Sequence, residues 1–280
     1  MPHRARMREL MMGIEGLALL RTATTADDAF LDARVAELRH LTDPTSEGLP
    51  AGKPLTELTP ADGYAVWAAR YDTLPNFVIA AEEPAVAALL AGLPPGRALD
   101  AACGTGRHAA RLHALGHDVV GVDQSPQMLA KAIEKVPGAH FETGSLEKLP
   151  LPDAAVDLVV CGLALAHVAE LGPAVAELRR VLAPGGHLIV TDPHPFMTLL
   201  QGPAMFVRPG GGLGFMPYHV HLAGDYLAAF AEQDLVVRAC REPLFAGPLP
   251  PGGYEERIAD ASLAAWKDVP AAIVWAVQAP

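Results

Sequence analysis

The chain has 280 residues, of which 51% are hydrophobic, and a formal net charge of −11. This length and hydrophobic content suit one α/β domain with additions, or at most two small domains. Proteins that bind nucleic acid usually concentrate lysine and arginine against the phosphates, so the excess of acid argues against a DNA or RNA substrate. Cys103, Cys161 and Cys240 form no CxxC pair. They indicate neither a disulfide framework nor a zinc site, and we expect a cytoplasmic protein without a bound metal.

The first 60 residues are expected to form an N-terminal helical cover. Apolar residues recur at helical spacing over 7–21 and 26–41, and Thr25 or Asp27 is a candidate N-cap of the second helix. Basic residues before an apolar run resemble a signal peptide, but Glu15 interrupts that run, so we interpret it as an amphipathic helix. A polar linker follows at 42–54, and no stretch of the chain has the length of a membrane span.

Short apolar runs alternate with helical patterns through residues 61–200. This pattern predicts a parallel sheet with helices on both faces, wound doubly by right-handed crossovers. The strands are expected at 97–102, 117–123, 139–143, 155–161 and 186–192. Helices are expected between them at 106–116, 125–135 and 172–183, the last ending on a Pro-Gly-Gly stop.

Residues 201–280 begin with a glycine- and proline-rich loop at 201–217. We expect this loop to be a lid inserted over an acceptor site, since its glycines permit hinge motion. A helix is predicted at 224–233, followed by strand-like runs at 234–242 and 271–278. These two runs are expected to extend one edge of the same sheet. The sequence thus divides into a cover (1–60), a core (61–200), and a lid with the final strands (201–280).

A glycine-rich turn, LDAACGTG at residues 99–106, lies where the first strand of the core meets its helix. In a doubly wound sheet this turn is at the topological switch point, where ligands bind. Gly104 and Gly106 would let the backbone turn sharply and approach a ligand. Asp100 would face a pyrophosphate poorly, whereas it suits the cationic amine of an amino-acid moiety. A plain tight turn and a nicotinamide-binding turn are the alternatives.

Asp123 ends the second strand, where a carboxylate can accept hydrogen bonds from both hydroxyls of a ribose. Ser125 and Pro126 then open the next helix as N-cap and first-turn residue, and Met128 could offer a polarisable side chain to an adenine face. Taken alone, Asp123 could equally be a polar strand end. Its spacing from the glycine-rich turn, one helix and one strand, favours a ribose ligand.

Four segments in order resemble class I S-adenosylmethionine (SAM)-dependent methyltransferases, within the methyltransferase type 11 group. They are LDAACGTG, GVDQSPQML, LPLPDAAVDLVVCGLALAHV and LRRVLAPGGHLIVTD, and the resemblance extends over residues 60–242. It implies an α/β fold with a doubly wound, mostly parallel seven-stranded sheet whose last strand runs antiparallel. It also implies SAM as cofactor, and it says almost nothing about the methyl acceptor.

The resemblance also assigns expected cofactor contacts. Ala102, which replaces a motif glycine, would form with Gly104 and Gly106 the loop under the methionine part. Asp123 would hold the ribose, and Gln124 and Met128 would flank the adenine. Ser145 and Leu146 match the segment that reads the adenine edge, although many relatives carry an acid at the position of Ser145. The carbonyl of Cys161 would lie near the cofactor, and Tyr71 would reach its carboxylate.

The acceptor side is predicted from the position of its residues and, for His219, from the resemblance of YHVHLAGDYL to a lid segment that contacts acceptors in relatives. A sulfonium is already a strong electrophile, so catalysis needs mainly positioning and desolvation, with a base where the acceptor carries a weakly acidic proton. His194, directly after a strand end, is the first expected base and His219 the second. Trp67, His167, Tyr218 and His221 are expected to contact the acceptor. Core packing is the alternative for Trp67, and bracing of a helix is the alternative for His167.

The sequence therefore predicts methyl transfer from SAM to an oxygen, nitrogen or carbon of a small aromatic or apolar metabolite, as in natural-product biosynthesis. We expect a monomer or homodimer that binds neither nucleic acid nor membrane. An NAD-dependent oxidoreductase is an alternative, because Ala109 would complete a GxGxxG pattern, but Asp100 and the later Pro-Gly-Gly segment argue against it. A non-catalytic SAM-binding protein is a second alternative, and an RNA methyltransferase is disfavoured by the net charge.

Overall fold

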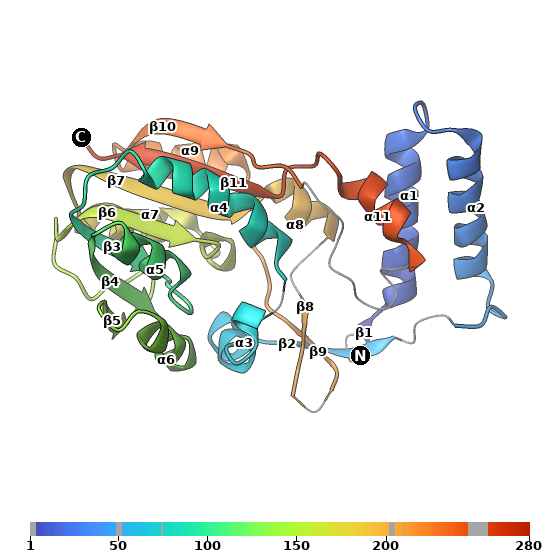
Figure 1. Cartoon of the computed structure of the whole chain (residues 1–280), viewed down its shortest axis with the longest axis horizontal. Helices are drawn as coiled ribbons and strands as arrows, with labels where there is room; N and C mark the ends of the chain where they lie inside the picture. The colour runs from blue at the N-terminus through green and yellow to red at the C-terminus, as the bar shows by residue number, and fades with distance from the viewer. Residues whose placement is uncertain (1–3, 49–51, 74, 202–204, 210, 246–256) are drawn as a thin grey trace. The chain divides into compact units, whose positions relative to one another are not determined.

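The computed structural model describes residues 4–48, 52–73, 75–201, 205–209, 211–245 and 257–280 (Figure 1). The described residues divide into two compact units, each built from several stretches of the chain. The first lies within 1–56, 207–214 and 244–269, and the second within 57–206, 215–243 and 270–280. These units interleave along the chain, whereas the sequence analysis divides it into three consecutive segments.

A seven-stranded sheet in the order β10-β11-β7-β6-β3-β4-β5 forms the centre of the second unit. The five strands from β7 to β5 run parallel, while β11 is antiparallel to both β7 and β10. The strand bounds are β3 Arg97–Ala101, β4 Asp118–Asp123, β5 His140–Thr143, β6 Val156–Gly162, β7 Leu182–Pro193, β10 Val236–Arg241 and β11 Ala272–Gln278. The predicted mostly parallel seven-stranded sheet is therefore confirmed.

Alternate residues of the strands fill two separate cores. In β6, Val159 and Cys161 pack on the side of α7 (Leu171–Val181) and α9 (Ala223–Glu232). Leu158 and Val160 of the same strand pack on the side of α4 (Phe77–Leu90) and α5 (Arg107–Ala114). A sheet buried on both faces requires apolar side chains at successive positions, which is why its strands read as continuous Val- and Leu-rich runs.

Side-chain caps fix where several helices begin. Ser125 accepts the Met128 N–H at 3.4 Å and so opens α6 (Pro126–Lys135). Asn76 caps α4 by accepting the N–H groups of Val78 and Ile79. Thr59 accepts the Asp62 N–H at 3.2 Å at the start of α3 (Pro60–Trp67). Two short 3-10 turns, η1 (Tyr71–Thr73) and η2 (Leu165–His167), complete the segments that lie near the site.

The first unit contains a helical hairpin, α1 (Met7–Thr22) and α2 (Asp28–Thr42). A buried ion pair between Glu15 and Arg34, 2.9 Å from carboxylate to guanidinium, joins the two helices. The guanidinium of Arg21 donates to the Ala265 carbonyl at 2.7 Å and so holds α11 (Ala259–Trp266) against α1. The prediction of two N-terminal helices is confirmed, and Asp27 is the N-cap of α2.

Several short elements were not predicted from the sequence. A four-stranded sheet in the order β1-β2-β9-β8 has bounds Arg4–Ala5, Lys53–Glu57, Leu213–Phe215 and Met205–Val207. Helices α8 (Pro195–Gln201) and α11 also occupy stretches that the sequence presents as loops. Strands of two to five residues depend on partners far away in the chain, so no local pattern reveals them. Residues 202–204 and 210 of the predicted lid lie outside the described residues. No helix in the described part of the chain is long and apolar enough to cross a membrane.

Candidate functional site

A pocket of about 430 Å³ lies in the second unit, at the carboxyl ends of the parallel strands. Its walls come from the loops after β3, β4, β5 and β6, together with α3, η1 and the segment that contains His219. Carboxyl ends of parallel strands meet at one edge of the sheet, so residues from four separate loops face the same space. This volume is in the range of pockets that take a cofactor or a small molecule.

The glycine-rich turn forms the floor of the pocket with an unusual backbone. Ala102, Gly104 and Gly106 all have positive φ, at 54°, 54° and 80°. A Cβ on Gly104 would meet open space, whereas one on Gly106 would lie 3.1 Å from Ala132 of α6. Gly104 therefore leaves its backbone open to a ligand, and Gly106 allows α6 to pack closely. Ala102 holds a left-handed conformation that glycine adopts without strain, which explains why the motif usually has glycine there.

Asp123 connects the turn to the next helix. Its carboxylate accepts the Gly104 N–H at 2.9 Å and the Ser125 N–H at 2.8 Å, and the residue is 8% exposed. Burial raises the pKa of this carboxyl, while the backbone N–H groups that it accepts lower it. A carboxylate has about four acceptor positions, so it keeps acceptor capacity for a ribose hydroxyl beside these backbone bonds.

Asp100 does not line the pocket. Its carboxyl is 1% exposed and accepts the Ala109 N–H of α5 at 2.7 Å. Burial raises its pKa to about 6. Asp100 lies on the same face of β3 as Ala98, whose side chain packs with α4 and α5, because side chains alternate between the two faces of a strand. Its carboxyl therefore braces the first turns of α5, beneath the glycine-rich turn.

The structure brings most of the other predicted cofactor residues to the pocket. Those that line it are Tyr71, Ala102, Gly104, Asp123, Gln124, Met128, Ser145 and Leu146. Gly106 and Cys161 lie behind this wall; Cys161 is fully buried, and burial raises the pKa of its thiol well above the usual value. Its neighbours Gly162 and Leu163 reach the pocket instead, and Leu163 has a φ of 57° that is strained for a branched side chain.

A hydrogen-bonded pair, Tyr64 and His167, forms another part of the wall. The Tyr64 hydroxyl is 2.9 Å from Nε2 of His167, and Nδ1 of the same ring is 3.2 Å from the Pro217 carbonyl. A carbonyl can only accept, so Nδ1 carries the proton and Nε2 accepts from Tyr64. Burial lowers the pKa of His167 to about 4, so the imidazole is neutral. Tyr64 lines the pocket although it was not among the predicted site residues; its helical spacing from Trp67 and Tyr71 was the available signal.

Aromatic rings surround this pair. The ring of Trp67 lies 5.1 Å from those of both Tyr71 and Phe206, and that of Tyr218 lies 4.9 Å from His167. Trp67 and Tyr218 stand behind the lining residues and support them. His219 itself lines the pocket, with its N–H bonded to the Ala166 carbonyl at 2.8 Å. His221 is not among the lining residues, and its Nε2 bonds to the Val168 carbonyl at 2.9 Å.

His194 follows the end of β7, as expected, but it is not among the lining residues. Its Nδ1 accepts the Phe196 N–H at 3.2 Å, and its Nε2 lies 3.1 Å from the carboxylate of Glu242. Both ring nitrogens are therefore engaged, one at the start of α8 and one at the end of β10. The structure brings His219 and His167 to the pocket and leaves His194 outside it.

Asp192 is a buried acid beside the pocket, near the end of β7. Its carboxyl accepts the Ala166 N–H at 3.0 Å and the Tyr226 hydroxyl at 2.7 Å, so it holds the segment that carries His167. Burial raises its pKa to about 7, although both hydrogen bonds favour the ionised form. The described residues contain no group of three or more His, Cys, Asp or Glu that could hold a metal ion.

Asp192→Asn should make the protein more stable above neutral pH. Because its folded pKa of about 7 lies above the unfolded value, Asp192 stabilises fully below about pH 4, and this contribution is lost as pH rises through about 7. Asparagine keeps an acceptor for Ala166 and offers a donor to Tyr226. Urea unfolding at pH 5 and pH 8 should show that the free energy of unfolding of wild type falls relative to that of Asp192→Asn as pH rises. The expected fall is about 3 kcal/mol, for the two pH units between pH 5 and the folded pKa of about 7. Asp118→Asn, an exposed change, is the control. Parallel stability profiles for wild type and Asp192→Asn would contradict this.

Comparison with known proteins agrees with this geometry. Residues 99–190 match the family model described as a methyltransferase domain. A demethylmenaquinone methyltransferase of Thermus thermophilus is 43% identical over 104 residues, which cover 35% of this chain and 47% of that protein. A malonyl-[acyl-carrier protein] O-methyltransferase of Serratia marcescens is 37% identical over 109 residues, 39% of this chain and 40% of that protein. The chain thus spans less than half the length of either relative.

A solved structure shows the fold beyond the matched segment. The SAM-dependent methyltransferase of Mesorhizobium loti superposes with a TM-score of 0.55 at 23% identity, over 72% of this chain and all of that one. The pocket lies at the carboxyl ends of the parallel strands, where a doubly wound sheet of this order binds its ligand. Residues 99–190 are therefore a methyltransferase domain, and the fold around them is that of a class I SAM-dependent methyltransferase.

Proposed function

We propose that this chain transfers a methyl group from SAM to a small, uncharged, aromatic or apolar acceptor. The observation that carries the proposal is a single pocket with two kinds of wall. One wall has the glycine-rich turn, Asp123 and Met128, and the other has Tyr64, His167 and His219. Both walls belong to the second unit. A donor and an acceptor held in one enclosed space would be positioned for direct transfer.

The first wall fits the cofactor. Gly104 leaves its backbone open, and Asp123 retains acceptor positions for the ribose after bonding the turn. Met128 is buried at the start of α6 beside Gln124, where an adenine would lie. When bound, SAM supplies an electrophilic methyl on a sulfonium. The protein residues are then needed to bind, to orient the acceptor in line with that methyl and to exclude water.

The charges of the pocket oppose an anionic acceptor. Apart from two histidines, the acidic or basic side chains on its wall are two carboxyl groups, Asp123 and Glu147. A carboxylate or phosphate on the acceptor would meet this negative charge in a partly desolvated space, and like charges there are mutually unfavourable. Tyr64, Leu163 and Val168 offer apolar surface and one hydroxyl instead. A phenol, an indole-like carbon or a neutral amine fits these surroundings.

His219 is the base that the pocket favours. It lines the wall, whereas both ring nitrogens of His194 already have partners outside it. His167 has both nitrogens bonded as well, so it fixes the direction of the Tyr64 hydroxyl. The Tyr64 oxygen donates its proton to His167 and keeps a lone pair that can accept a hydrogen bond from the acceptor. Tyr64 and His167 thus orient the acceptor, and His219 takes the proton where one must leave.

The setting of the reaction is part of the same proposal. We infer a cytoplasmic enzyme of natural-product biosynthesis that acts as a monomer or homodimer on a free small molecule. Cys103, Cys161 and Cys240 are all free thiols, which agrees with a reducing compartment. The net charge of −11 agrees with a substrate other than nucleic acid.

Asp123→Ala should weaken binding of S-adenosylhomocysteine, the demethylated cofactor, by about 1.5–3 kcal/mol, the contribution of hydrogen bonds to a charged group. Part of this loss comes from releasing the Gly104 N–H that the carboxylate accepts. Isothermal titration calorimetry measures the affinity. Asp118→Ala, at the exposed start of the same strand, is the matched control and should bind normally. Unchanged affinity in Asp123→Ala would show that the ribose lies elsewhere.

An uncharged acceptor should be methylated in preference to its charged analogue. We suggest pairing 2-naphthol with 2-naphthoic acid, and an aryl amine with an aryl phosphate, in assays with SAM read by mass spectrometry. The uncharged member of a pair should react at least about tenfold faster, because like-charge contact costs several kcal/mol. Glu147→Gln should narrow this preference, since it removes one of the two pocket carboxylates. Faster methylation of the acids would rule out the proposed acceptor class.

His219→Ala should lower turnover by about 10²–10⁴ on an acceptor with a weakly acidic proton, as expected for loss of a general base, and leave S-adenosylhomocysteine affinity intact. His194→Ala is the matched control and should retain turnover, because its ring lies outside the pocket wall. The reverse result would restore His194 as the base. Normal turnover in both variants would mean that transfer runs on positioning alone.

A further inference from the structure

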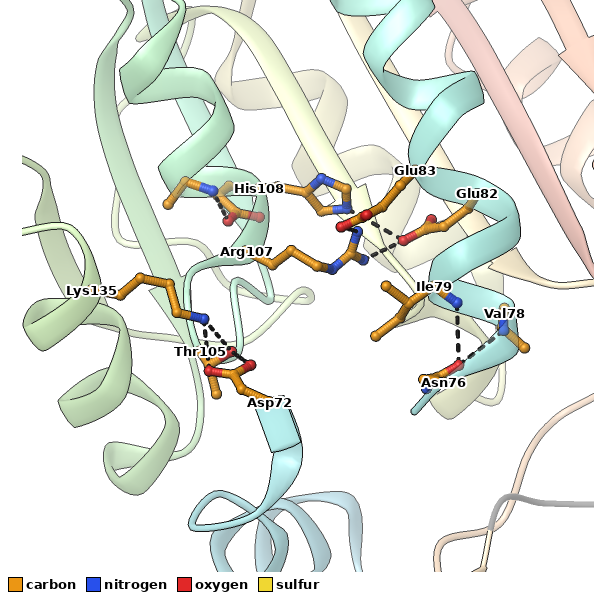
Figure 2. A network of polar contacts seen from close by, with 12 residues as sticks. Asp72, Asn76, Val78, Ile79, Glu82, Glu83, Thr105, Arg107, His108 and Lys135 are labelled. Atoms are coloured by element: carbon orange, nitrogen blue, oxygen red, sulfur yellow. Dashed lines mark hydrogen bonds and ion pairs between the residues drawn. The ribbon is translucent and has the colours of Figure 1, made fainter. Parts of the chain in front are cut away.

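Three segments of the pocket wall meet at one polar contact (Figure 2). Asp72 of η1 accepts the Thr105 hydroxyl at 2.7 Å and the Lys135 ammonium at 2.7 Å. The same ammonium donates to the Thr105 oxygen at 3.1 Å. Each of the three side chains therefore contacts the other two. We call this triangle the clasp.

Each member of the clasp belongs to a segment that lines the pocket. Asp72 follows Tyr71, and Thr105 follows Gly104; both preceding residues are on the pocket wall. Lys135 is the last residue of α6, the helix whose first turn brings Met128 to the wall. The clasp thus fixes the segment that carries Tyr71 relative to the turn and the helix on the other side of the cofactor space.

The clasp is accessible to solvent. The side chains of Asp72 and Lys135 are 45% and 32% exposed, whereas Thr105 is 2% exposed. Burial alone would raise the pKa of Asp72. Hydrogen bonds from Lys135 and Thr105, together with the positive charges of Lys135 and Arg107, hold this pKa below its usual value. Asp72 is therefore charged at neutral pH. The interaction is ionic, and dissolved salt can weaken it.

A second contact holds the next helix by different means. Glu82 of α4 is fully buried and bonds to the guanidinium of Arg107, which follows Gly106 (Figure 2). Breaking this pair would leave a buried charge without a partner, at a large cost. The chain from η1 to α4 therefore has a buried attachment at Glu82 and an accessible one at Asp72.

We propose that Asp72, Thr105 and Lys135 act as positioning residues that hold Tyr71 over the cofactor, so that cofactor affinity depends on this accessible ionic contact. The inference rests on the proposed use of the pocket for SAM. An isolated surface ion pair stabilises a protein little. Here the pair is joined to a buried hydroxyl within the glycine-rich turn, and its loss releases a segment that contacts the ligand.

The first test is S-adenosylhomocysteine affinity, measured by calorimetry at low salt. Asp72→Asn and Lys135→Met should each weaken binding about three- to tenfold, the range of one charged contact with its hydrogen bonds. The double variant should be no weaker than either single one, because both remove the same interaction. Lys131→Met is the matched control: it breaks the exposed Lys131–Glu134 pair of the same helix and should leave affinity unchanged.

The second test separates positioning from a general effect of charge. In a Tyr71→Ala background, Asp72→Asn should change affinity by less than about twofold, since the residue it positions is gone. Raising the salt concentration to about 0.5 M should remove most of the difference in S-adenosylhomocysteine affinity between wild type and Asp72→Asn. A full loss on Asp72→Asn in the Tyr71→Ala background, or normal affinity in Asp72→Asn alone, would overturn the proposal.

Hydrogen exchange without ligand makes the clasp testable apart from the proposed function. The amides of Ala68, Arg70 and Thr73 bond to carbonyls within the same segment and should exchange faster in Asp72→Asn than in wild type or Lys131→Met. If wild type binds S-adenosylhomocysteine but exchange and affinity are unchanged in Asp72→Asn, the clasp is refuted and the proposed function stands. If wild type fails to bind it, the proposed function fails, and the exchange rates still decide whether the clasp holds this segment.

Discussion

One buried carboxylate, that of Asp123, connects the two strand ends on which the pocket depends. It accepts the Gly104 N–H from the turn after β3 and the Ser125 N–H at the start of α6. Burial raises the pKa of this group, and backbone donors offset part of the cost of its charge. The Gly104 bond also opposes the strain of the left-handed backbone at residues 102–106. One buried side chain thus joins the glycine-rich turn to the start of α6 at the floor of the pocket.

The fold, and the presence on the pocket wall of most residues expected to bind the cofactor, could be predicted because their signals are local. Buried parallel strands read as apolar runs, and the residue that ends such a strand must lie at the sheet's ligand edge, as Asp123 does. A position near a strand end does not determine on which face of the sheet a side chain lies. Asp100 was expected to contact the cofactor, and its carboxyl does not line the pocket. The alternation of β3 turns that carboxyl toward α5, so it braces the turn without lining the pocket.

The wall proposed to hold the acceptor could not be predicted from the sequence, because its contacts join distant positions. Tyr64 and His167 are 103 residues apart, and the carbonyl that fixes the His167 tautomer belongs to Pro217. His194 follows a strand end as predicted, yet β11 runs antiparallel beside β7 and β10 beyond it, and Glu242 after β10 takes up the His194 ring. A position after a strand end indicates the correct edge of the sheet; it does not determine which loop reaches the ligand.

Buried and accessible contacts have different roles around this pocket. Asp123 and Asp192 are buried, and through their hydrogen bonds they hold the turn and the segment that carries His167. A ligand that is bound between several walls needs a way in. At least one of these walls must therefore move at a low cost in free energy. The Tyr71 segment meets that requirement, because the contact between Asp72 and Lys135 lies partly in solvent and water can replace it. With the proposed clasp, the fold would combine a preorganised floor with a wall held by an accessible ionic contact.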